Sequence, residues 1–210
     1  MLIIGVLSQK GGVGKSTLAR LLAREYAAAG WDVLVADMDI QQGTSFDWYT
    51  RRLESALEPD FSVQKFSSVD KAVRQGEKYD LVIFDGAPHA TRQTQQIAQI
   101  SQLVILPAGS SKDDLTPQIR LAHELSDVLV PTRILFVMTR VGSDMETEGA
   151  KDWVRQAGYR VIDGSIPEKT AYRIAMDSGR TLTETSYKSL NSRADEVVEA
   201  IVGQFDNVTK

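Results

Sequence analysis

Three glycines and two lysines lie close together in the segment SQKGGVGKST, at residues 8–17. Glycine lets the backbone approach a ligand closely, and a helix N-terminus favours anions, so the amide groups here would surround phosphate oxygens. Lys15 would then reach the β and γ phosphates, and the Ser16 hydroxyl would bind Mg²⁺. The residues predicted to hold phosphate are Gly11, Gly12, Val13, Gly14, Lys15, Ser16 and Thr17.

Three aspartates follow apolar segments further along the chain. Asp37 ends the run DVLVAD, Asp39 comes two residues later, and Asp85 ends the run DLVIFD. Phosphoryl transfer needs one carboxylate for Mg²⁺ or its waters and another to orient the attacking water. We therefore predict Asp37 and Asp85 as metal ligands, together with Ser16, and Asp39 as a catalytic residue. A helix cap or a solvated loop acid is the alternative for each aspartate.

Apolar segments alternate with amphipathic ones along the chain. The apolar runs are short and mostly lack polar alternation, as expected for strands buried on both faces of a parallel sheet. They cover residues 2–8, 32–37, 61–66, 80–85, 102–108, 132–139 and 159–163, and a helical segment closes the chain at about 184–205. We predict a single α/β domain over residues 1–210, with a doubly wound, mainly parallel sheet of about seven strands flanked by helices.

The composition and charge of the chain exclude or disfavour several classes of protein. The chain has no cysteine, which excludes disulfides and thiolate metal sites. No apolar run approaches the length of a membrane-spanning helix, and we expect a cytoplasmic protein. The net charge of −4 argues against a broad nucleic-acid-binding coat. Residues 151–193 differ from the rest of the chain in carrying a net positive charge, with eight Lys or Arg against five Asp or Glu.

The glycine-rich segment resembles the deviant phosphate loop K-G-G-x-G-K-[ST]-[ST] of the ParA and MinD ATPase family, at all eight positions. It departs from the strict G-x-x-x-x-G-K-[ST] pattern, because Gln9 stands where the first glycine is required. Lys10 occupies the place of the family's extra lysine. The resemblance implies that Lys10 contacts the nucleotide of the other subunit in a dimer and takes part in catalysis with Lys15 and Asp39. We expect Lys10 to point outward, because two ammonium groups on one loop repel each other.

Two further segments extend the resemblance. Residues 37–41 read D-M-D-I-Q against the family's D-x-D-P-Q, and residues 85–88 read D-G-A-P against D-x-x-P. Ile40 replaces the usual proline, which leaves the backbone after Asp39 less constrained. His89, directly after Pro88, would sense the state of the second segment. The resemblance implies a P-loop ATPase that binds ATP or ADP with Mg²⁺.

The C-terminal third would supply the base pocket. The segment TRVGSD follows a predicted strand where the family contacts adenine, and the segment from Ile166 resembles the family's I-P segment. The resemblance therefore implies that Thr139, Arg140, Ile166 and Pro167 bind the base. Ordinary loop and strand-end roles are the alternative.

Basic residues in the same third could form a DNA-binding surface. In the family, a dimer made with ATP binds DNA without sequence preference, and this resemblance points to Arg155, Lys169, Arg173, Arg180 and Lys188. A scatter of basic residues on a solvated face is the alternative.

The chain is most similar to short plasmid-partition ParA proteins. Because the first predicted strand begins at Leu2, we expect no N-terminal helix-turn-helix region of the kind found in longer relatives. The sequence EVVEAIVGQFDNVTK has several acids and a single lysine, which disfavours membrane targeting by a basic amphipathic helix. The resemblance implies an ATP-dependent homodimer, associated with the nucleoid, whose weak hydrolysis a centromere-binding partner stimulates. One alternative is an ATPase that positions protein cargo or a transfer complex. Another is a metabolic enzyme of the dethiobiotin synthetase type, against which Lys10 argues.

Overall fold

The computed structural model describes residues 1–88 and 92–209, with side chains as far as residue 205. His89 lies outside the described residues. The described strands are β1 (Leu2–Val6), β2 (Val33–Asp37), β3 (Ser62–Lys65), β4 (Leu81–Asp85), β5 (Leu103–Ala108), β6 (Ile134–Val141) and β7 (Arg160–Pro167). The described helices are α1 (Lys15–Ala28), α2 (Thr44–Glu54), α3 (Val69–Gly76), α4 (Arg92–Ile100), α5 (Lys112–Leu125), α6 (Asp144–Gln156), α7 (Thr170–Asp177) and α8 (Lys188–Thr209), with a 3₁₀ turn at Pro131–Arg133.

All strand pairs in the described sheet are parallel, in the order β3-β2-β4-β1-β5-β6-β7. This confirms the predicted seven-stranded, doubly wound α/β fold. One helix was missed: α7 follows β7 in a segment to which the periodicity assigned no helix. It is only eight residues long, so its apolar pattern is too short to stand out.

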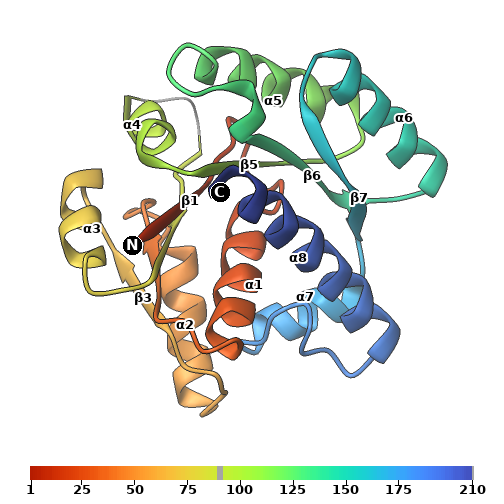
Figure 1. Cartoon of the computed structure of the whole chain (residues 1–210). Coiled ribbons are helices and arrows are strands. Elements are labelled where there is room, and N and C mark those ends of the chain that lie inside the picture. The colour runs from red at the N-terminus through yellow and green to blue at the C-terminus, as the bar shows by residue number, and fades with distance from the viewer. Residues whose placement is uncertain (89–91, 210) are drawn as a thin grey trace.

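Helices cover both faces of the sheet (Figure 1). One core contains side chains of α3, α4, α5 and α6, and the other contains side chains of α1, α2, α7 and α8. Successive residues of β1 belong to opposite cores, with Ile3 in the first and Ile4 in the second. This is why the central strands read as continuous apolar runs.

The register of the sheet brings the predicted site residues to one edge of the sheet. Asp85 pairs with Val6 at the end of β1 and with Asp37 at the end of β2. The glycine-rich loop leaves β1 at this same edge, so the loop and the aspartates meet beyond the carboxyl ends of neighbouring strands. Ligands of doubly wound sheets bind in that position.

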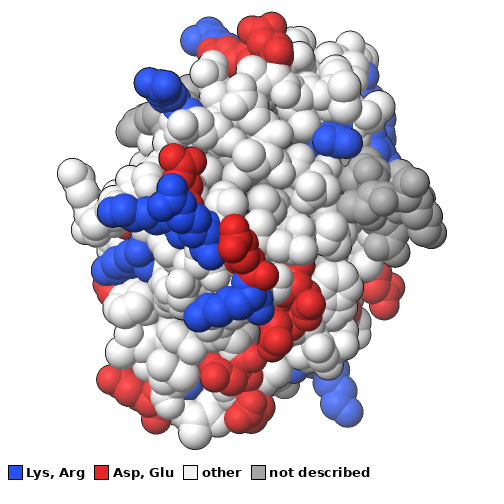
Figure 2. Space-filling model, turned by 60° about the vertical axis from the view of Figure 1, so that its left-hand side comes forward, with Lys and Arg blue, Asp and Glu red and all other residues white. Residues whose placement is uncertain are grey.

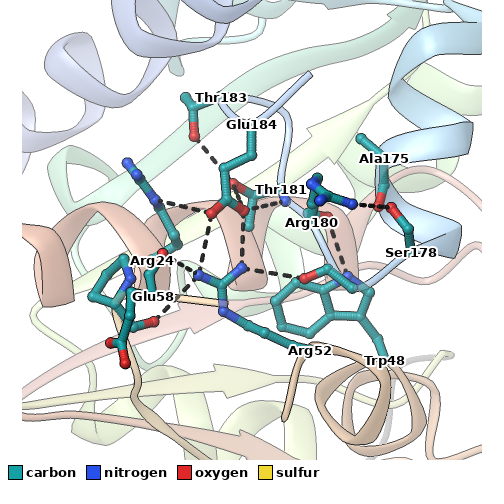
Figure 3. A network of polar contacts seen from close by, with 12 residues as sticks. Arg24, Trp48, Arg52, Glu58, Ala175, Ser178, Arg180, Thr181, Thr183 and Glu184 are labelled. Carbon is teal, nitrogen blue, oxygen red and sulfur yellow. Dashed lines mark hydrogen bonds and ion pairs between the residues drawn. The ribbon is translucent and has the colours of Figure 1, made fainter. Parts of the chain in front are cut away.

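A buried ion pair fixes the far end of α2. Arg52 is 1% exposed, and its Nη1 and Nη2 donate to Glu184 Oε2 and Oε1 at 2.9 and 3.1 Å. Burial alone would raise the pKa of Glu184, but the hydrogen bonds from Arg52 and from the Thr181 N–H lower it. Trp48, one turn earlier, donates from Nε1 to the Arg180 carbonyl oxygen at 3.2 Å (Figure 3). These contacts join α2 to the segment that links α7 to α8.

Candidate functional site

The glycine-rich loop passes directly into α1. Gly12 and Gly14 have φ angles of 79° and 94°, in the left-handed region that favours glycine, and Gly14 caps the N-terminus of α1. Lys15 begins the helix and is 8% exposed, with Nζ 3.4 Å from the Lys10 carbonyl oxygen. Burial lowers the pKa of Lys15, while Asp85 and Asp39 oppose that shift. The ammonium group therefore lies near carboxylates and has little solvent around it.

Two polar side chains from distant elements hold this loop. Gln118 of α5 is fully buried; it accepts a hydrogen bond from the Gln9 N–H at 3.2 Å and donates to the Leu7 carbonyl at 3.2 Å. Thr139 donates to the Val13 carbonyl at 2.6 Å. Sequence reasoning missed Gln118, although an amide on the apolar face of a predicted helix was an available signal.

Asp37 is engaged by backbone groups. Its side chain is fully buried, Oδ1 accepts from the Asp39 N–H at 3.1 Å, and Oδ2 accepts from the N–H groups of Ser45 and Phe46 at 3.0 and 3.1 Å. Burial raises the pKa of Asp37, as does neighbouring Asp85, although these hydrogen bonds act in the opposite direction. Both oxygens already have donors, so this geometry favours the alternative role, in which Asp37 holds the start of α2.

Asp85 is arranged differently, with one oxygen engaged and one open. Oδ2 accepts from the Ser45 hydroxyl at 2.6 Å, whereas Oδ1 is buried and has no hydrogen-bond partner among the described residues. A buried carboxylate oxygen without a donor is costly unless a ligand supplies one. Ser16 lines the same cavity as Asp85, described below, and its Oγ is 3.2 Å from Thr44 Oγ1. Mg²⁺ binds oxygen ligands and keeps several of its waters, which donate hydrogen bonds to nearby oxygens. The Ser16 hydroxyl and the Asp85 carboxylate therefore fit that ion.

Lys10 has a partner within its own chain. Its Nζ lies 2.5 Å from Asp114 Oδ1 on α5, and the Lys10 side chain is 43% exposed. The hydrogen bond to Asp114 raises the pKa of Lys10. Burial would raise the pKa of Asp114, but the hydrogen bonds from Lys10 and Ser111 lower it. The Lys10 side chain is half-exposed, but its ammonium is held by a carboxylate of its own chain, which was not predicted.

Two adjoining cavities lie at this edge of the sheet. The phosphate cavity, of about 270 Å³, is lined by loop residues and by Asp39, Thr44 and Asp85. The base cavity, of about 330 Å³, extends over β6, β7 and α7. Both are lined by Gly14, Thr17, Arg20 and Arg140, so they meet at these residues.

All four predicted base-pocket residues line the base cavity: Thr139, Arg140, Ile166 and Pro167. The Thr139 hydroxyl, however, binds the phosphate loop. Arg140 has a φ of 54°, which is uncommon outside glycine, and its Nε lies 3.9 Å from Glu168 Oε2. Whether these residues hold a base stays a prediction.

The structure separates the five predicted DNA-binding residues. Arg155 lies on α6, on the other face of the sheet from α7 and α8, and pairs with Asp152 and Asp163 at 2.9 and 3.3 Å. Lys169 and Arg173 line the base cavity, whereas Arg180 and Lys188 lie on either side of the segment that leads to α8. Figure 2 shows the side of the molecule where α3 lies in Figure 1, and there basic side chains lie among acidic ones.

No helix in the described part of the chain is long and apolar enough to cross a membrane.

The chain is similar to a family of nucleotide-binding domains, to two described proteins and to a solved structure. Residues 4–182 match the CobQ/CobB/MinD/ParA nucleotide binding domain. A protein for maintenance of carboxysome distribution, from Gloeobacter kilaueensis, is 27% identical over 92% of this chain and 88% of its own length. Protein ParA of Rhizobium radiobacter is 26% identical over 92% and 90%. A Borrelia burgdorferi protein described as a plasmid partition protein, bound to AMPPNP, has a TM-score of 0.74 at 18% identity over 97% of this chain and 99% of its own.

Proposed function

Because the chain belongs to the CobQ/CobB/MinD/ParA family of nucleotide-binding domains, we propose that it is a Mg²⁺-dependent ATPase of the partition type. It binds ATP, forms a homodimer, holds DNA without sequence preference and releases it after hydrolysis. The observation that carries this proposal is the phosphate cavity, where the loop, Asp39 and Asp85 surround one space. A centromere-binding partner would stimulate the reaction.

The predicted phosphate-loop residues and aspartates have distinct tasks in this proposal. The loop amides and Lys15 bind the β and γ phosphates, because they form a positive concavity at the start of α1. Ser16 and Asp85 Oδ1 would hold Mg²⁺ and its waters, and the ion when bound neutralises charge on the phosphates. Asp39 orients the attacking water; its Oδ1 already accepts from the Gln42 N–H at 3.1 Å, which fixes its side chain. Asp37 has a structural task.

Lys10 would join the two subunits. To reach the nucleotide of the partner subunit, its ammonium must leave Asp114, which now holds it at 2.5 Å. A triphosphate offers more negative charge than one carboxylate, so a second subunit loaded with ATP can replace Asp114. We propose that this exchange allows the dimer to form with ATP.

A second candidate function is the positioning of protein cargo, with hydrolysis as a timer. The carboxysome-distribution relative favours it, while the plasmid partition protein favours DNA segregation. The nucleotide site does not separate the two candidates.

Sedimentation of the purified protein tests the proposal. The protein would be run with ADP and with a non-hydrolysable ATP analogue, each with and without duplex DNA of arbitrary sequence. We expect a dimer with the analogue alone, a DNA-bound dimer when both are present, and a free monomer with ADP. A monomer in every condition would contradict the ATP-driven dimer, and a dimer that ignores DNA would favour cargo positioning.

A further inference from the structure

Arg20 lies on α1 where the phosphate and base cavities meet. Its neighbours Leu18, Ala19 and Leu21 are apolar and fully buried, and Arg20 itself is only 7% exposed. An arginine on the buried side of a helix needs a reason, because transferring its charge from water is costly. The motifs in the sequence give it no role.

One nitrogen of Arg20 is fixed by the protein. Nε donates to Ser45 Oγ at 3.0 Å, and that hydroxyl donates to Asp85 Oδ2 at 2.6 Å. The guanidinium also lies over the Trp48 ring, 5.3 Å from its centroid. These contacts hold the orientation of the guanidinium plane.

The other two nitrogens of Arg20 have no hydrogen-bond partner in the described part of the chain. Among the described residues Arg20 has no carboxylate within ion-pair distance, and neither Nη atom has a hydrogen bond. Nor is either Nη atom among the buried atoms that lack a partner, so both keep some accessible surface. Since Arg20 lines both cavities, that surface faces them.

The charge of Arg20 also favours an anion in the adjoining cavity. Burial lowers the pKa of Arg20 to about 10, although Asp85 and Asp37 act to raise it. The group is still charged at neutral pH, and a buried charge without a partner is destabilising. An anion in the adjoining cavity would relieve that cost and accept two parallel hydrogen bonds from the Nη atoms.

We propose that Arg20 is a nucleotide-binding residue that donates to the α phosphate, the phosphate that joins the ribose. Thr17, one turn earlier on α1, was predicted to hold phosphate and lines both cavities at the same place, on the side of the phosphate cavity that leads to the base cavity. The inference rests on the proposed nucleotide binding. It adds a contact that belongs to neither the phosphate loop nor the aspartates.

Titration calorimetry with ADP, with and without Mg²⁺, tests the proposal. We expect Arg20→Met to weaken ADP binding about tenfold or more in both conditions, because a charge-assisted hydrogen bond is lost. Arg20→Lys should recover part of that loss, because it restores the charge. Arg24→Met is the matched control, since Arg24 lies one turn further along α1 and lines neither cavity; we expect it to bind ADP like the parent.

Ser45→Ala separates contact with the nucleotide from an indirect effect. It breaks the link from Arg20 to Asp85, so we expect it to weaken ADP binding only when Mg²⁺ is present. If Arg20→Met also loses affinity only with Mg²⁺, Arg20 merely positions Asp85 and the proposal is overturned. Parental ADP affinity in Arg20→Met, with the parent itself binding well, would also overturn it. A parent that does not bind ADP would instead refute the proposed function.

Discussion

The phosphate cavity and the base cavity share a wall, but their polar groups are held in different ways. In the phosphate cavity, Lys15 and Asp85 are buried; Lys15 begins α1 and Asp85 ends β4. In the base cavity, Arg140 and Arg173 are exposed, and each lies near Glu168, at 3.9 and 3.8 Å. The first site is therefore preorganised by backbone and burial, whereas the second has exposed charges that both lie near one acid, Glu168. Substitutions in the first should have larger effects.

The largest expected effect on ATP binding is that of Lys15→Ala. Removing the charge that opposes the β and γ phosphates should weaken ATP binding by roughly two orders of magnitude. Fluorescence titration with a labelled ATP analogue measures it, and Lys71→Ala, an exposed lysine on α3, is the control. Undiminished ATP affinity would refute the phosphate-loop assignment.

Arg52→Ala tests the ion pair that anchors α2, and not the residues of the nucleotide site. Glu184 would be left buried without its bidentate partner, so we expect the free energy of unfolding to fall by about 3–5 kcal/mol. Urea denaturation followed by circular dichroism measures the change. The neighbouring Arg51 is exposed, and Arg51→Ala should leave stability nearly unchanged. Equal stability of the two variants would show that the buried pair does not anchor α2.

Asp39→Ala should separate binding from hydrolysis. In the proposed mechanism Asp39 orients water and does not hold the phosphates, so ATP should still bind, while hydrolysis should slow by about a hundredfold. Phosphate release in steady state and ATP titration together measure both effects. A normal rate of hydrolysis would remove Asp39 from the mechanism.

The smallest expected effect is on DNA binding. Changing Arg173 and Arg180 together to alanine should weaken binding to duplex DNA and lower the slope of log affinity against log salt by about 2, if each arginine contacts one phosphate. Dimer formation with ATP should be kept. Since Arg173 also lines the base cavity, ATP affinity is measured in parallel; a loss of ATP affinity with unchanged DNA affinity would place Arg173 at the nucleotide instead.

The same contrast explains how much could be predicted from the sequence. The fold and the phosphate loop depend on short-range features, namely apolar runs and glycines that lead into a helix. The partners of single side chains depend on contacts between distant segments: Gln118 reaches the loop from α5, Asp114 receives Lys10, and Ser45 links Arg20 to Asp85. No periodicity encodes such pairings. For Asp37, position after a strand predicted proximity to the site, but not the three backbone donors that it accepts from.

The central claim is that Lys10 completes the nucleotide site of a partner subunit, and a mixing experiment tests it most directly. A Lys10→Ala subunit keeps its own phosphate loop, and a Lys15→Ala subunit keeps the lysine that would cross the interface. With a non-hydrolysable ATP analogue, we expect each variant alone to sediment as a monomer and their equimolar mixture to contain a dimer. If Lys10→Ala alone formed a dimer like the parent, Lys10 would not complete its partner's site, and the account would be contradicted.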